Sequence, residues 1–203
     1  MSKFEFPPSI KSRPVWGTLT ARSGPAHLFI ADAEGAEAIL GIATPELMQT
    51  AHFIYIPRGT DFSDKLRALS PAQFYEGPSY AAAVQRIRHT LAEAKMGLQV
   101  YLTGTEGLMG QALNEAMQAG IPHTAIQTEH RGSVARRMQC VHCKGITEDV
   151  ETDPFVCGHC GLNLFVRDHY SRRLAAYQGV CIDAEDPGNI PCLLYTSPSP
   201  RDS

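Results

Sequence analysis

The sequence predicts an α/β protein in which a parallel sheet of five strands is followed by a small ribbon that binds zinc through four cysteines. Two patterns lead to this prediction. Between residues 24 and 130, short apolar segments alternate with helical segments, which is typical of a parallel sheet with helices on both faces. Beyond this region, two C-x-x-C pairs are separated by 13 residues, a spacing typical of a four-thiolate metal site.

Five segments have the length and apolar composition of buried strands. In chain order they span residues 27–31, 51–58, 72–77, 98–104 and 123–129. Four helical segments separate these strands, at residues 33–43, 62–69, 80–95 and 106–120. The third helix is the clearest, since its apolar residues recur every three or four positions. They are Ala83, Val84, Ile87, Leu91 and Ala94, and Gly97 and Gly120 end the third and fourth helices.

Composition narrows the class of protein. The chain of 203 residues is 43% hydrophobic and 19% charged, as in ordinary globular proteins, and its formal net charge is -3. The mild negative charge argues against nucleic-acid and membrane binding, which favour a basic surface. Because the sequence has no apolar run of about 18 residues and starts without an apolar signal segment, we expect a cytoplasmic protein. In a reducing compartment, paired cysteines favour metal over a disulfide.

Four segments are expected along the chain. Residues 1–23 form an N-terminal extension, residues 24–132 the α/β domain, and residues 133–191 the ribbon with a C-terminal segment that docks. The last segment, residues 192–203, resembles a translated sequencing adapter, so Cys192 carries no weight in the argument. We expect that the native C-terminus beyond residue 191 is missing.

The metal ligands are predicted from the spacing of the cysteines. Two thiolates on one tight turn can hold a metal ion from the same side, and two such turns complete a tetrahedral site. The predicted ligands are Cys140, Cys143, Cys157 and Cys160. Zinc is preferred because a small module needs metal binding to fold and a redox-silent ion suffices. A single rubredoxin-type iron is the alternative. A thioredoxin-like disulfide needs its C-x-x-C at a helix N-terminus within a βαβ pattern, and neither cysteine pair has that setting.

Other residues near the cysteines are expected to have no ligand role. Four thiolates already complete the coordination shell, so His142 and His159 are interpreted as neighbours of the site or as solvent-facing residues. Cys181 is interpreted as a small buried apolar residue. A closed shell leaves no position for substrate, and we expect no catalytic residue in this chain.

The first strand-to-helix turn is where a nucleotide phosphate would bind in a fold of this class. Its sequence, ADAEGAEA, retains only Gly35, and Asp32 and Glu34 place carboxylates near the helix N-terminus. Acidic groups are stabilised at a helix N-terminus for the same reason as phosphate, so they compete for that position. The turn therefore indicates a disabled phosphate site.

A second turn, YLTGTEGLMGQAL at residues 101–113, resembles the last strand–helix unit of the nicotinamide domain in ferredoxin–NADP reductase-like proteins. Gly104 and Met109 match that family, whereas Thr103 replaces its cysteine and Thr105 its proline. The resemblance implies a five-stranded domain like the reductase NAD domain. Its nicotinamide-binding residues are vestigial, namely Gly35, Gly104 and Met109.

Two further segments indicate their function less specifically than the cysteine pairs do. The basic cluster of residues 129–140 is interpreted as a solvated linker in preference to a phosphate site. The segment after the ribbon is rich in aromatic residues and is expected to dock on the ribbon, the α/β domain or a partner. The residues expected to make that contact are Phe165, Tyr170, Leu174 and Tyr177.

As a whole, residues 14–191 resemble the DmmA-type subunit of bacterial dimethylamine monooxygenase, most specifically in the ribbon and its continuation FVRDHYSRRLAAYQGV. The resemblance implies an accessory subunit of a multicomponent, NAD(P)H-dependent enzyme that demethylates dimethylamine to methylamine and formaldehyde. It also implies a hetero-oligomer in which haem, FMN and iron–sulfur centres belong to the partner subunits.

Two other interpretations of the sequence stay open. In one, the cysteines hold iron and the chain is a rubredoxin-like or reductase-like electron carrier. In the other, the chain is a zinc-ribbon module that binds nucleic acid, although its net charge of -3 argues against this.

Overall fold

The computed structural model describes residues 13–185 and residue 188. Contacts within the chain divide it into two compact units. The larger unit comprises Pro14–Ala135 and Arg172–Ala175, and the described part of the smaller one comprises residues 13, 136–171, 176–185 and 188. Each unit has its own sheet and its own apolar core.

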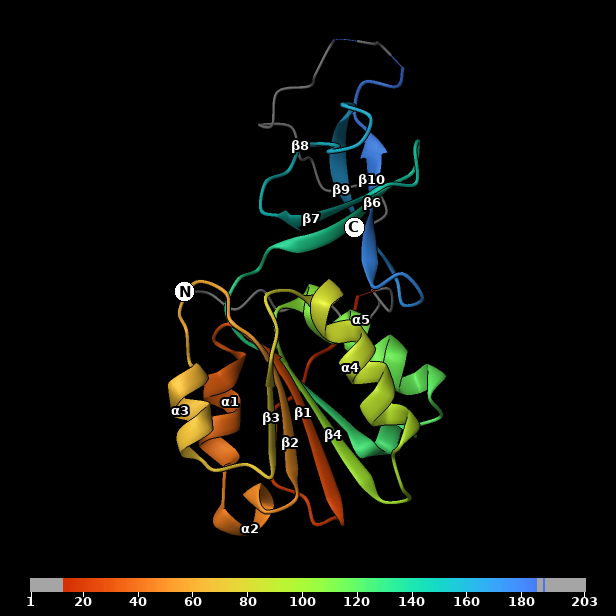
Figure 1. The fold of residues 1–203 in the computed structure, drawn as a ribbon. Helices are drawn as coiled ribbons and strands as arrows, with labels where there is room; N and C mark the ends of the chain where they lie inside the picture. Colours follow the sequence, from red (N-terminus) through yellow and green to blue (C-terminus); the bar gives the residue numbers. More distant parts are fainter. Residues whose placement is uncertain (1–12, 186–187, 189–203) are drawn as a thin grey trace, which may run out of the picture. The chain divides into compact units, whose positions relative to one another are not determined.

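The larger unit contains the predicted parallel sheet of five strands (Figure 1). Its strands are β1 (Ala26–Asp32), β2 (Ala51–Ile56), β3 (Gln73–Glu76), β4 (Leu98–Gly104) and β5 (Ile126–His130). They are ordered β3-β2-β1-β4-β5, and each neighbouring pair is parallel. This order reverses direction between β1 and β4, as in doubly wound folds, and confirms the predicted fold class.

Helices cover both faces of this sheet (Figure 1). They are α1 (Gly35–Ile42), α2 (Pro45–Met48), α3 (Ser63–Ala68), α4 (Tyr80–Ala92), α5 (Glu106–Gln118) and the 3-10 turn η1 (His123–Ala125). The sequence did not indicate α2 or η1. The fifth strand begins later than predicted because Ala125 N–H donates to Pro122 O, which forms a turn in its place. The third helix ends earlier than predicted, at Ala92, because residues from Lys95 onwards turn into β4.

The core follows from the alternation of side chains along β1, which is buried on both faces of the sheet. Leu28 and Ile30 pack in the cluster that contains residues of α4 and α5. Phe29 points to the other face, where its ring stacks on Tyr101 at 4.3 Å and meets Phe53 edge to face at 5.0 Å. Burial on both faces therefore explains why the central strand, β1, is a nearly continuous run of apolar residues.

The segment before β1 lies along β5 and contributes to the core. Gly17 N–H donates to Thr128 O at 2.9 Å. The side-chain amide of Gln127 pairs with the backbone of Thr20, accepting from its N–H at 2.9 Å and donating to its carbonyl at 2.8 Å. Leu19 is buried against the α1 face of the sheet. Part of the predicted N-terminal extension is thus packed structure in the larger unit.

The smaller unit is a second sheet, ordered β7-β6-β10-β9-β8. Its strands are β6 (Arg136–Cys140), β7 (Ile146–Val150), β8 (Phe155–Val156), β9 (Asn163–Ser171) and β10 (Ala176–Cys181). Only β10 and β6 are parallel among its paired described strands. Tyr177 is buried in the core of this unit, and the Tyr170 ring packs on it at 5.0 Å. The aromatic C-terminal segment therefore completes the ribbon itself, while Phe165 and Leu174 are half-buried.

No helix in the described residues combines the length and apolar character that a membrane span requires. The longest, α4 and α5, have 13 residues each.

Candidate metal centre

The smaller unit brings the four predicted cysteines together. The sulfur atoms of Cys140, Cys143, Cys157 and Cys160 all lie within 4.8 Å of one another, and among the described residues they form the one group with metal-binding geometry. Two of these distances run between the turns: 3.8 Å from Cys140 to Cys160 and 3.7 Å from Cys143 to Cys157. Four sulfurs at about 2.3 Å from a central zinc ion would be about 3.8 Å apart. The cluster thus has the size of a tetrahedral thiolate site.

The two turns share one backbone design. In the first, Cys140 N–H donates to Gly145 O and Lys144 N–H to Cys140 O, both at 2.9 Å. In the second, Cys157 N–H donates to Leu162 O at 2.9 Å and Gly161 N–H to Cys157 O at 3.0 Å. These bonds close each turn around its two sulfurs, so each pair presents both thiols on one side.

Tight closure requires a left-handed residue directly after the second cysteine of each turn. Gly161 takes this conformation with φ 74°, as glycine does without strain. In the first turn the residue is Lys144, with φ 64°, and Gly145 comes one position later. In the first turn the left-handed position thus belongs to a lysine and not to a glycine.

The four thiols interact strongly. Burial raises the pKa of Cys157, but hydrogen bonds from the backbone N–H groups of Cys160 and His159 and from neighbouring thiols outweigh burial and lower it to about 6. The Leu162 N–H lowers the pKa of Cys160, yet burial and the neighbouring thiols raise it to about 12. Four deprotonated sulfurs at this spacing would repel one another, so a metal ion bound among them would stabilise the thiolate forms and displace the remaining protons.

The histidines and Cys181 lie outside the sulfur cluster. His142 and His159 are both exposed, and the ring of His159 contacts the carbonyl of Ile146 at 2.7 Å. Cys181 is half-buried, and its thiol donates to Asp183 Oδ1 at 3.0 Å. Sequence reasoning missed the His159 contact, since Ile146 belongs to the strand that follows the first turn and no local pattern connects it to the second turn.

The nucleotide turn of the larger unit is filled by the protein itself. At the carboxyl ends of β1 and β4, where a doubly wound sheet binds its ligand, the Asp32 side chain is 2% exposed. Asp32 Oδ1 accepts the Thr105 N–H at 2.7 Å, and Oδ2 accepts the Thr105 hydroxyl at 2.6 Å. A buried carboxylate therefore occupies the N-terminal end of α5, where the charge of a phosphate would be stabilised.

The three residues interpreted as vestigial, Gly35, Gly104 and Met109, are closely packed in the larger unit. A Cβ on Gly104, whose φ is 121°, would lie 1.9 Å from Asp32 Oδ1, and a Cβ on Gly35 would lie 2.5 Å from Thr103 O. Met109 is fully buried in the core cluster that contains α4 and α5. These glycines are required here by the close approach of carboxylate, helix and strand.

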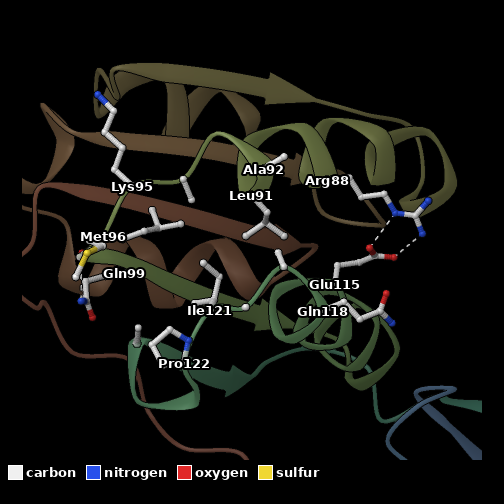
Figure 2. Close-up of a pocket in the computed structure, with 16 residues that line it drawn as sticks. Arg88, Leu91, Ala92, Lys95, Met96, Gln99, Glu115, Gln118, Ile121 and Pro122 are labelled. Atoms are coloured by element: carbon white, nitrogen blue, oxygen red, sulfur yellow. Dashed lines mark hydrogen bonds and ion pairs between the residues drawn. The ribbon is translucent and has the colours of Figure 1, made fainter.

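A hollow of about 830 Å³ opens elsewhere in the larger unit, between the C-terminal ends of α4 and α5 (Figure 2). Leu91 and Ile121 line it, and Arg88 and Glu115 form a two-bond ion pair across its rim at 2.8 and 2.7 Å. It lies beside the start of β4, at the amino ends of the strands. Ligands of doubly wound sheets bind at the opposite, carboxyl ends, so this hollow does not lie where such a fold binds a dinucleotide.

The basic cluster of residues 129–140 is largely paired with carboxylates. Arg131 contacts Glu129 at 2.6 Å, and Arg137 contacts Glu148 at 2.7 Å. Arginines engaged in this way have less charge to offer a phosphate backbone, which is the main source of nucleic-acid affinity.

Comparison with known families identifies the chain. The profile of the family described as "Dimethylamine monooxygenase subunit DmmA-like, N-terminal domain" matches residues 8–126, more than half of the chain. The chain belongs to the DmmA-like family. The profile of the family's C-terminal domain matches residues 137–180 of this DmmA-like chain, which include all four cysteines. The predicted resemblance is confirmed.

A curated relative of this DmmA-like chain is the "Heme-dependent oxidative N-demethylase delta subunit" of Ectopseudomonas mendocina (strain ymp). The two are 34% identical over 110 residues, which are 54% of this chain and 63% of the relative. The DmmA-like chain thus spans less than two thirds of that relative's length.

Solved structures similar to the DmmA-like chain include reductase domains. The ferredoxin reductase in carbazole 1,9a-dioxygenase is 16% identical with a TM-score of 0.42, over 57% of this chain and 34% of that one. The FAD/NAD binding domain of nitric oxide dioxygenase from Vibrio cholerae is 15% identical with a TM-score of 0.41, over 56% and 53%. These weak similarities carry no argument about ligands.

Proposed function

We propose that this DmmA-like chain is an accessory subunit of a multicomponent amine monooxygenase and that a structural zinc ion holds its ribbon together. The observation that carries the metal proposal is the sulfur cluster, in which the distances of 3.7 and 3.8 Å between the two turns match a tetrahedral thiolate site. A site closed by four thiolates has no open position for substrate, so its role is structural.

Zinc would supply much of the folding free energy of the smaller unit. Among the described residues of this unit, two of the seven that are buried in its core cluster are cysteines, Cys140 and Cys157, so the apolar core is small. Units of this size depend on metal ions or disulfides, and metal binding then becomes folding free energy. Reduced thiols at the site suit the cytoplasmic location that we propose.

The reaction of the complex would be the NAD(P)H-dependent demethylation of dimethylamine to methylamine and formaldehyde. The family description supports the substrate, and the name of the N-demethylase delta subunit supports membership of a hetero-oligomer. Haem, FMN and iron–sulfur centres would reside in partner subunits. The chain itself would bind no nicotinamide, because the Asp32 carboxylate occupies the end of α5 that a phosphate would need.

An electron-transfer role with iron in the cysteine site is the second candidate. It is favoured by the exposure of Cys143, which would bring a bound ion close to solvent and to a redox partner. Tetrahedral four-sulfur sites accept iron as well as zinc.

The test is the metal content and visible spectrum of the full chain purified without added metal. One zinc per chain and a colourless protein are expected. One iron with visible absorbance would favour the electron carrier, and a protein without metal would contradict both candidates.

A second experiment addresses the complex. The full chain is co-expressed with the haem, flavin and iron–sulfur subunits of a dimethylamine monooxygenase. Dimethylamine-dependent NAD(P)H oxidation should require the chain, and the subunits should co-purify at a fixed ratio. Full activity without it would contradict the subunit role.

A further inference from the structure

The ligand distances depend on how the two cysteine turns are placed relative to each other. Within each turn, backbone hydrogen bonds set the geometry. The site, however, also needs close sulfurs from different turns: Cys140 lies 3.8 Å from Cys160, and Cys143 lies 3.7 Å from Cys157. Contacts between the turns must therefore hold the thiolates at the spacing that a metal ion requires.

The side chain of His159 makes such a contact. His159 lies in the second turn, and its Nε2 lies 2.7 Å from the carbonyl oxygen of Ile146, which directly follows the first turn. Because a carbonyl oxygen only accepts, Nε2 carries the proton in this bond. A second, longer bond runs beside it, from the Gly158 N–H to Thr147 Oγ1 at 3.3 Å.

The His159 ring fits because the first turn has a glycine beneath it. A Cβ on Gly145 would lie 2.4 Å from Cδ2 and 2.5 Å from Cγ of His159. Atoms cannot approach that closely, so any larger residue would displace the ring. The backbone of Gly145 is not left-handed, so backbone conformation does not explain why this residue is a glycine. The close packing of the His159 ring does.

His142 occupies the same place in the first turn and makes no equivalent bond. Both turns read Cys-x-His-Cys, with His142 and His159 before the second cysteine. The carbonyl that would correspond to Ile146 belongs to Asn163, and it already accepts the Ile182 N–H at 3.0 Å. Within the described part of the chain, no hydrogen bond of His142 is found. The two histidines are thus a matched pair in which one contacts the opposite turn.

We propose that His159 is a positioning residue for the metal site: its ring, seated on Gly145 and bonded to Ile146 O, holds the two cysteine turns together. The inference rests on the proposed metal binding. Residues that orient metal ligands from outside the coordination shell typically contribute roughly 10- to 100-fold to metal affinity.

The test compares His159→Ala with His142→Ala in the full zinc-loaded chain, by the rate of zinc transfer to a chromogenic chelator. His159→Ala should release zinc about tenfold faster or more, and His142→Ala should match the wild type. His159→Gln, which keeps an N–H donor at similar reach, should recover most of the slow release. The ligand-field spectrum of the cobalt-substituted protein should change in His159→Ala alone.

Gly145→Ala provides an independent arm. Gly145→Ala should speed zinc release as much as His159→Ala does. In a chain that already carries His159→Ala, the added Gly145→Ala should have a smaller effect, because the two ring atoms that its Cβ would meet most closely, Cδ2 and Cγ of His159, are absent. Equal release rates in wild type, His159→Ala and His142→Ala would overturn the role of His159 while leaving the metal site intact. A wild-type chain that retains no metal would instead overturn the proposed function, and with it this inference.

Discussion

Asp32 and Thr105 are joined by two hydrogen bonds, of 2.7 and 2.6 Å, at the point where the strand order of the larger sheet reverses. One bond comes from the backbone N–H at the start of α5 and the other from the hydroxyl that caps this helix. The carboxylate thus satisfies a helix N-terminus that would otherwise favour an anionic ligand.

Replacing Asp32 should destabilise the larger unit. Asp32→Ala removes a buried acceptor and leaves the Thr105 N–H and the Thr105 hydroxyl proton without that acceptor, which should cost about 2–4 kcal/mol of unfolding free energy. Urea unfolding followed by Trp16 fluorescence measures this, since the only tryptophan lies in the larger unit. Asp64→Ala, at an exposed position of α3, is the matched control and should stay within about 0.5 kcal/mol. Equal stabilities of the two variants would contradict the capping role.

Two glycine substitutions should act in opposite directions. Gly104→Ala would place a methyl group 1.9 Å from Asp32 Oδ1 at a φ of 121°, so the protein should lose several kcal/mol of stability, about 3 or more, or fail to fold. Gly41→Ala lies in α1, meets no atom within 4 Å, and should stabilise by about 0.5–1 kcal/mol. Thermal unfolding of both variants checks the pair. A well-tolerated Gly104→Ala would show that this turn is looser than the structure indicates.

Metal removal should unfold one unit and spare the other. With a strong chelator, amide hydrogen exchange should accelerate across residues 136–171 and 176–181, because the ribbon loses the ion that we propose holds it. Exchange in β1 and β4, and the fluorescence of Trp16, should not change, since Trp16 donates its indole N–H to Glu106 within the larger unit at 2.8 Å. Cys143→Ser should reproduce the effect without chelator. Unchanged exchange in the ribbon would argue against a structural metal.

Stability should fall as the pH drops from about 6.5 to 4 because of His52. Burial, with a smaller contribution from the positive charge of Arg86, lowers the pKa of His52 to about 4 in the folded protein. The unfolded chain takes up this proton at its ordinary pKa near 6.5, so between these values the unfolded state binds more protons and is favoured as the pH falls. In the folded protein, the Nε2 atom of His52 is buried and has no hydrogen-bond partner in the described part of the structure.

Urea unfolding at several pH values checks this. His52→Gln should flatten the pH dependence between about 4 and 6.5 relative to the wild type, since a glutamine does not titrate. His89→Gln is the control, because His89 is exposed on α4 beside Glu93 at 3.4 Å. If His89→Gln flattened the curve and His52→Gln did not, the burial argument for His52 would be wrong.

Local patterns predicted most of the fold. The five parallel strands and the helix of α4 follow from apolar runs and periodicity, which depend on neighbouring residues. The boundaries of α4 and β5 were less accurate, because the turns after Ala92 and at Pro122 are stabilised by backbone hydrogen bonds. The packing of Leu19 on the sheet was missed, since Leu19 lies outside any helical or strand pattern.

The sequence by itself determined the alternation of the five parallel strands with the four main helices and the grouping of four cysteines, because spacing and periodicity are local properties of a chain. The resemblance to the DmmA-like family was likewise carried by sequence motifs. Only the tertiary structure decided what Asp32 and His159 do. Their partners, Thr105 and Ile146, lie 73 and 13 residues away, and no local pattern connects them. Such contacts exist only once the strands and turns have packed, since a hydrogen bond requires its two atoms at about 3 Å.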